Sequence, residues 1–165
     1  MAESPPCKKA PHVSAGSALQ INNNVKATVT IYLTGINNLT TTNQSSAGLQ
    51  KDNEAQLIIT NASDTTTGIL KASSDGSGYG AGIGSGNYGS CNNITIKSGS
   101  VTASSTSGAG IGGGLYGSCN NITISGGSVN AQVGCTPHQN LDSSGSYDPK
   151  SPEVYLYVIP NKKLN

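Results

Sequence analysis

The chain has 165 residues, a length typical of one domain. Only 10% of the residues are charged, the net charge is +1, and all nine basic residues are Lys. Nucleic acid is therefore not an expected partner, because phosphate binding favours Arg clusters or a basic stripe. Membrane insertion is not expected either, since no apolar run approaches the roughly 20 residues of a membrane-spanning helix.

Short strands separated by Gly, Asn and Ser turns are expected along most of the chain. Residues 1–16 hold three Pro and are predicted to be irregular. Four similar groups of strands are predicted within residues 17–134: 17–20 and 27–33; 47–50, 55–60 and 68–72; 81–84, 93–96 and 100–103; and 109–112, 121–124 and 128–131. Residues 135–152 are predicted to be a linker or return loop, and residues 153–165 a C-terminal strand or the start of a next module.

The third and fourth groups have almost the same sequence. The segment from Gly80 to Gly84 returns at 108–112, and the segment from Tyr88 to Ile96 returns 28 positions later at 116–124. Apolar and polar residues alternate within each strand, and no window shows the 3.6-residue period of a helix. Strands that recur in one order stack on their counterparts about 4.8 Å away. The sequence therefore predicts an all-β fold, a right-handed parallel β-helix (solenoid) of about four coils with about three short strands each.

The outward positions of the last two coils are the ones that a ligand would meet. The glycines of the Ala-Gly-Ile-Gly strands are expected to point outward and leave a flat, bare face, with Tyr88 and Tyr116 stacked beside it. Tyr79 lies near the entrance of the third coil, and Asn87 precedes Tyr88. Rings beside polar side chains can form a platform for sugars, so these four residues are the predicted ligand site. The alternative is that the tyrosines only cap a turn and protect the stack.

The repeat also brings Cys and Asn residues into equivalent positions. Cys91 and Cys119 should lie about 4.8 Å apart, a separation that a disulfide tolerates. Two stacked, buried thiols are the other alternative, and the sequence favours it. Two pairs of Asn side chains are expected at one corner of successive coils, with hydrogen bonds along the solenoid axis: Asn92 with Asn120, and Asn93 with Asn121.

No metal and no cofactor are expected. A calcium-binding roll needs a carboxylate in each turn, whereas Lys97 is the only charged residue between Gly76 and Leu141. The side chains with zinc-ligand chemistry flank opposite ends of the predicted stack and are not expected to meet; they are Cys7, His12, Cys135 and His138.

Carboxylates gather in the second coil and its exit turn, at Asp52, Glu54, Asp64 and Asp75. With Lys51 or Lys71 nearby, they could serve a polysaccharide lyase or a glycoside hydrolase. The alternative, which the sequence favours, is a set of solvated loop charges that keep the chain soluble. Catalysis is therefore less expected than binding, and no catalytic residue is assigned.

The last two coils carry a family resemblance. Residues 108–114 followed by 121–131 resemble the "GAGIGGG…ITISGGTVTA" repeats of large cell-surface and secreted proteins. Such repeats occur especially in Gram-positive gut bacteria and are often labelled adhesin-like or carbohydrate-binding. The resemblance covers about residues 17–134, strongly in the last two coils and loosely in the first two. It implies an extracellular or cell-surface β-helix, although a Cys in each clear coil departs from the commoner pattern.

Three functions are open at this point. The favoured one is a non-catalytic extracellular module of a larger secreted protein, either an adhesin stalk or a solenoid that binds a glycan or host-surface ligand. The second is a carbohydrate-active enzyme that uses the carboxylates of the second coil. The third is a structural solenoid that self-associates through its ends, because an end without a polar cap presents an open strand edge.

Overall fold

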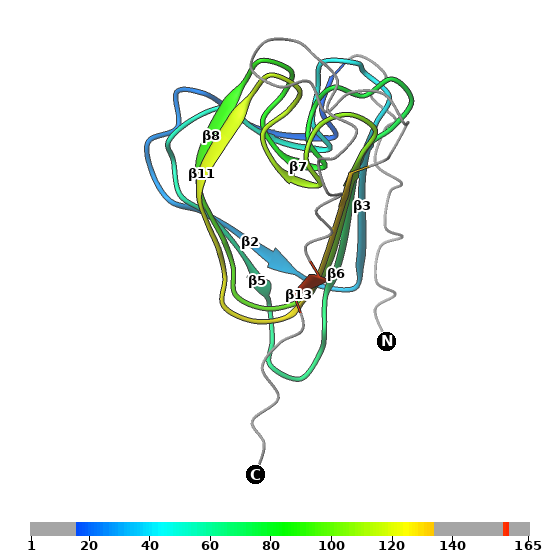
Figure 1. Cartoon of the computed structure of the whole chain (residues 1–165). Coiled ribbons are helices and arrows are strands. Elements are labelled where there is room, and N and C mark those ends of the chain that lie inside the picture. Colours follow the sequence, from blue (N-terminus) through cyan, green and yellow to red (C-terminus); the bar gives the residue numbers. More distant parts are fainter. Residues whose placement is uncertain (1–15, 134–156, 159–165) are drawn as a thin grey trace, which may run out of the picture.

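The structure, a computed structural model, describes residues 16–133 and 157–158 of the chain. In these residues the fold is all-β, and the chain winds through four coils that contribute one strand each to three sheets. Figure 1 shows the successive coils lying on top of one another. The predicted parallel solenoid is therefore confirmed. The predicted irregular start, the linker and most of the C-terminal segment lie outside the described residues.

The three sheets are parallel throughout the solenoid. Sheet A consists of β1 (Leu19–Ile21), β4 (Leu49–Lys51), β7 (Ile83–Gly84) and β10 (Ile111–Gly112). Sheet B consists of β2 (Val29–Leu33), β5 (Leu57–Asn61), β8 (Ser90–Ile96) and β11 (Ser118–Ile124). Sheet C consists of β3 (Ile36–Thr41), β6 (Ile69–Ser74), β9 (Ser100–Ser105) and β12 (Ser128–Val133), and β13 (Tyr157–Val158) joins β12 antiparallel.

The strand register follows the sequence repeat. Coils 3 and 4 keep a step of 28 residues, so that Cys91 lies opposite Cys119, and Val101 opposite Val129. The looser equivalence predicted for the first two coils also holds in sheet A, where one residue of each coil forms a single rank: Leu19, Leu49, Ile83 and Ile111.

One strand of the first coil, β3, was not predicted. Asn37 in β3 occupies the register position that Leu70, Val101 and Val129 fill in the later coils. A polar residue at an inward position hides the alternation on which strand prediction rests. The Asn37 amide is satisfied by donating to the backbone oxygens of Thr34 and Ile69, at 3.1 and 3.0 Å.

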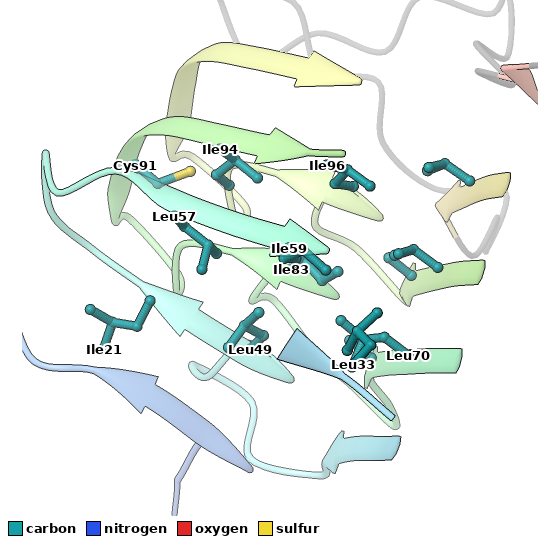
Figure 2. Close-up of a cluster of buried hydrophobic side chains, with 14 residues drawn as sticks. Ile21, Leu33, Leu49, Leu57, Ile59, Leu70, Ile83, Cys91, Ile94 and Ile96 are labelled. Carbon is teal, nitrogen blue, oxygen red and sulfur yellow. The ribbon is translucent and has the colours of Figure 1, made fainter. Parts of the chain in front are cut away.

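The core is a narrow column of aliphatic side chains that runs along the solenoid axis (Figure 2). It contains no Phe or Trp, since the chain has neither. Each buried Leu or Ile contributes about 1.5–3 kcal/mol of hydrophobic stabilisation, and each coil obtains it mainly from its neighbours. The fully enclosed members come from all three sheets: Leu49 and Ile83 of sheet A, Leu57, Ile59, Ile94 and Ile96 of sheet B, and Leu70 and Val101 of sheet C.

The glycines of sheet A do not form a bare outer face, so that prediction is wrong. A Cβ on Gly82 would lie 2.6 Å from the backbone nitrogen of Ser104, and one on Gly110 would lie 2.5 Å from the backbone nitrogen of Gln132. Ser104 and Gln132 belong to sheet C. Sheet A therefore lies against the backbone of sheet C, and glycine is required because the two backbones approach each other so closely.

Buried hydroxyls close the corner between sheet C and sheet A. Thr41, Ser74 and Ser105 share one register position and are almost fully buried. Ser74 Oγ donates to the oxygen of Ser46 at 2.9 Å, and Ser105 Oγ donates to the oxygen of Gly80 at 2.6 Å. Each of these two hydroxyls thus satisfies a backbone carbonyl of the turn that leads into its own coil.

The fourth coil leaves two strand edges open. Among the described residues, β13 pairs with the outer edge of β12, whereas no strand pairs with the outer edge of β10 or of β11. Ile122 in β11 is 38% exposed, although its register partner Ile94 is fully buried. Self-association through this end remains a prediction.

Candidate functional site

The predicted tyrosines lie in the turns that connect sheet A to sheet B in coils 3 and 4. The rings of Tyr88 and Tyr116 stack on each other, with centroids 5.0 Å apart and planes inclined by 21°. The two side chains are 71% and 60% exposed. The structure therefore forms a two-ring column at this corner, with each ring facing its partner on one side.

Both tyrosines adopt a backbone conformation that tyrosine disfavours. Their φ angles are 57°, in the left-handed region, where an L-residue with a bulky side chain is held at a cost of roughly 1–2 kcal/mol. The other non-glycine residues with positive φ in the described chain are Asn93 and Asn121, a type that tolerates this region. Glycine would fit the tyrosine positions without strain, and these turns already contain several glycines.

Two further pairs of polar side chains follow the tyrosines in the sequence, and each pair has one member in coil 3 and one in coil 4. Cys91 points into the core, so strand alternation places Ser90 and Asn92 on the outer side of β8, while Tyr88 is exposed in the turn that precedes this strand. The same alternation applies one coil later. We name the resulting surface the Tyr–Ser–Asn face; it consists of Tyr88, Ser90, Asn92, Tyr116, Ser118 and Asn120.

The Ser and Asn members of this face were missed as ligand-site residues. Ser90 Oγ and Ser118 Oγ form a hydrogen bond of 3.2 Å across the two coils. Asn92 was predicted only as a structural ladder residue, and its Nδ2 donates to Glu54 Oε1 at 2.9 Å. The signal that could have found them is strand alternation on either side of the inward cysteines, which places Ser90 and Asn92, and likewise Ser118 and Asn120, on the outer side.

Tyr79 and Asn87 lie near this corner but are less accessible. Tyr79 is half-buried, and its backbone oxygen accepts from the nitrogen of Leu115 at 2.6 Å. The Leu115 oxygen in turn accepts from the nitrogen of Tyr88 at 2.9 Å. Asn87 is also half-buried, and its Oδ1 is buried without a hydrogen-bond partner among the described residues. The structure thus brings Tyr88 and Tyr116 into contact and places the other two residues behind them.

A disulfide connects the two coils directly beneath the face. Cys91 and Cys119 are bonded, with Cα atoms 4.5 Å apart, and Cys91 is fully buried. Of the two alternatives that the sequence left open, the structure contains the bridge and not the pair of free thiols. The cross-link joins equivalent positions of coils 3 and 4, so it holds the outward side chains of the two coils beside it at a fixed separation.

Asparagine side chains connect successive coils next to the disulfide. Asn121 Nδ2 donates to Asn93 Oδ1 at 3.1 Å, and Asn93 Nδ2 donates to the backbone oxygen of Glu54 at 2.9 Å. The predicted hydrogen bond along the axis is confirmed for this pair. For Asn92 the amide instead bonds to the Glu54 carboxylate of the coil below.

Lys51, considered as a basic group beside the carboxylates of the second coil, lies inside the solenoid. The residue is fully buried, and its Nζ donates to the backbone oxygens of Asn53 and Asn92 at 2.7 and 2.6 Å. Burial lowers the pKa of the Lys51 ammonium below its usual value, while the nearby Glu54 and Asp52 carboxylates partly oppose this shift. Lys51 therefore links coil 2 to coil 3 under the Tyr–Ser–Asn face.

The lowered pKa of Lys51 predicts a pH dependence of stability. Between the folded and unfolded pKa values the unfolded chain binds more protons, so raising the pH through this window favours the folded state. We expect the difference in unfolding free energy between the wild type and Lys51→Met to increase from about pH 8 to about pH 10. Urea titrations followed by circular dichroism at both pH values measure it. Lys71→Met, at an exposed position, should follow the wild type, and an equal trend in both variants would contradict the prediction.

Two of the four carboxylates considered for catalysis share a turn, and the other two lie elsewhere. Asp52 and Glu54 lie between β4 and β5, Asp64 lies between β5 and β6, and Asp75 follows β6, so they occupy three different turns of the coil. Asp52 Oδ1 accepts from the nitrogen of Gly86 at 2.8 Å, a structural role. In residues 16–133 no group of three or more His, Cys, Asp or Glu side chains is arranged to hold a metal ion. Cys7, His12, Cys135 and His138 lie outside the described residues.

Comparison with known proteins supports the architecture. The family model described as Beta helix repeat matches residues 94–115 and 122–145, and the matches begin at Ile94 and Ile122, which are register partners. No curated protein and no solved structure matches the chain. No helix in the described part of the chain is long and apolar enough to cross a membrane. The fold and the family match together support a β-helix repeat module.

Proposed function

We propose that this chain is a non-catalytic module of the cell surface or extracellular space that binds a glycan through the Tyr–Ser–Asn face. The observation that carries the proposal is the pair of exposed tyrosine rings on a strained backbone. The strain of both residues amounts to roughly 2–4 kcal/mol. Stacking of two rings returns only about 0.5–1.5 kcal/mol beyond the burial of their area. Burial of part of each ring adds to this return, so the two tyrosines bring little net stability, and ligand binding gives the exposed rings a role beyond stability.

The chemistry of the face suits a sugar. Each ring keeps one face and its edge free of the other ring, and a pyranose presents apolar C–H groups that pack on such surfaces. The adjacent hydroxyl and amide groups can donate to and accept from sugar hydroxyls, as the few polar groups of a ligand site usually do. The arrangement offers apolar contact and hydrogen bonding side by side.

Two further observations support the non-catalytic and extracellular parts of the proposal. Of the four carboxylates of the enzyme alternative, Asp64 and Asp75 lie in other turns than Asp52 and Glu54, and these two accept hydrogen bonds from the Gly86 nitrogen and the Asn92 amide. A disulfide joins coils 3 and 4, and disulfides persist mainly in oxidising environments such as the extracellular space. A structural stalk that carries no ligand is the second candidate, and the outer edges of β10 and β11, which no described strand pairs with, favour it.

Replacing both tyrosines by glycine separates the two candidates. We expect Y88G/Y116G to abolish glycan binding and to be more stable than Y88A/Y116A by about 2 kcal/mol, because glycine relieves the positive φ and alanine does not. A glycan array and urea denaturation give the two readouts.

Matched variants define the controls. Tyr32→Ala removes another exposed tyrosine, 67% exposed on β2, and should leave binding unchanged. Y88F/Y116F keeps both rings and should retain most of the binding. If no glycan binds the wild type, and the glycine variant is markedly less stable than the wild type, the rings are structural and the stalk is the better function.

A further inference from the structure

We infer that the glycan bound by this face is uncharged and that Asn120 makes its principal hydrogen bonds. The inference rests on the proposed function and extends it from a general glycan to one class. It also assigns a role in specificity to Asn120, which the sequence predicted only as a hydrogen-bond partner of Asn92 along the solenoid axis.

The distribution of charge argues against an acidic glycan. From Gly76 to Val133 the only charged residue is Lys97, which lies in the turn between β8 and β9 and not on the Tyr–Ser–Asn face. The buried Lys51 ammonium points at backbone oxygens and is covered. Two carboxylates lie beside the face: Glu54 accepts from the Asn92 amide at 2.9 Å, and Asp52, next to Gly89, accepts from the nitrogen of Gly86 at 2.8 Å. A uronic acid, sulfate or sialic acid would meet like charges there, and within the described residues no Lys side chain belongs to the face.

Asn120 is the amide of the face with its hydrogen-bonding capacity least occupied by the protein. Asn92 is half-buried, and one of its donors is occupied by Glu54. The Ser90 and Ser118 hydroxyls bond to each other. Asn120 is exposed, and within the described residues no hydrogen bond occupies its amide, which offers two donors and an acceptor. Asn120 lies in the same coil as Tyr116, two strand positions beyond Ser118.

A panel of neutral and acidic polysaccharides tests the inference directly. Affinity electrophoresis with xylan, mannan, soluble β-glucan and starch is compared with polygalacturonate, hyaluronan and alginate, each at low and high salt. We expect binding to one or more neutral polymers with an affinity that does not change with salt, because screening weakens only charge interactions. Asn120→Leu should weaken this binding roughly five- to tenfold, the effect of losing one or two hydrogen bonds.

The control is the same substitution on another sheet. Asn38→Leu replaces an exposed Asn on β3, and it should leave the affinity unchanged. Binding confined to acidic polymers, or an Asn120→Leu variant that binds like the wild type, overturns this inference while the proposed glycan binding stands. Absence of binding to every polymer of both classes overturns the proposed function itself.

Discussion

Replacing Gly82 by alanine is expected to lower the free energy of unfolding by about 3 kcal/mol or more, a large part of the roughly 5–15 kcal/mol that stabilises a typical domain. The added Cβ would lie 2.6 Å from the nitrogen of Ser104 and 2.7 Å from the oxygen of Gly110. Both are backbone atoms, the first in β9 and the second immediately before β10, so no flexible side chain can move aside. Gly82 is not among the glycines with positive φ, so the effect reports crowding alone.

Gly16→Ala is the matched control for this prediction. A Cβ at Gly16 would meet no atom within 4 Å, and we expect the stability of this variant to stay within about 0.5 kcal/mol of the wild type. Urea denaturation followed by far-ultraviolet circular dichroism is the suitable measurement, because the chain has no Trp. If Gly82→Ala unfolds at the same urea concentration as Gly16→Ala, sheets A and C do not approach each other as closely as described.

Removing the disulfide is expected to have an effect of similar size. The bond between Cys91 and Cys119 closes a loop with a sequence separation of 28 residues. The chain-entropy relation gives about 3.6 kcal/mol of stabilisation for a loop of this length. The double variant C91A/C119A should therefore unfold at a markedly lower urea concentration than the oxidised wild type.

The remaining cysteines, Cys7 and Cys135, call for a controlled background. With both changed to Ser, the oxidised protein should lose stability on addition of reductant, while the same background carrying C91A/C119A should not respond. Mass spectrometry after alkylation under non-reducing conditions identifies the bonded pair. Full alkylation of Cys91 and Cys119 in the unfolded, unreduced protein would show that the bond is not formed.

Much of the fold could be predicted because coils 3 and 4 repeat almost the same sequence. The 28-residue period fixes which residues of coils 3 and 4 share a register position, and alternation then fixes the inward residues, such as Ile94 and Ile96. The first two coils are harder to recognise in the sequence because their turns differ in length and polar residues replace apolar ones. At Asn37 an inward position carries an amide that finds backbone partners, a compensation that only the folded neighbours reveal.

The candidate site was predicted in part, for a similar physical reason. The ring column follows from the repeat, because Tyr88 and Tyr116 are separated by one coil. The direction of the sheet A glycines depends on where sheet C lies, which no local pattern encodes. The burial of Lys51 likewise depends on the backbone carbonyl of Asn92, a residue far from it in the sequence. The strain at the tyrosines became apparent only from the backbone angles.

The constant step between coils 3 and 4 has a consequence for how such a surface can grow. Because each coil is held mainly by its neighbours, inserting another copy of the 28-residue unit would lengthen the solenoid without disturbing the existing coils. Every copy would add one ring, one hydroxyl and one amide at a fixed spacing. Under the proposed function, the number of repeats would set how many sugar units are bound at once, so that duplication of the 28-residue unit would raise the avidity.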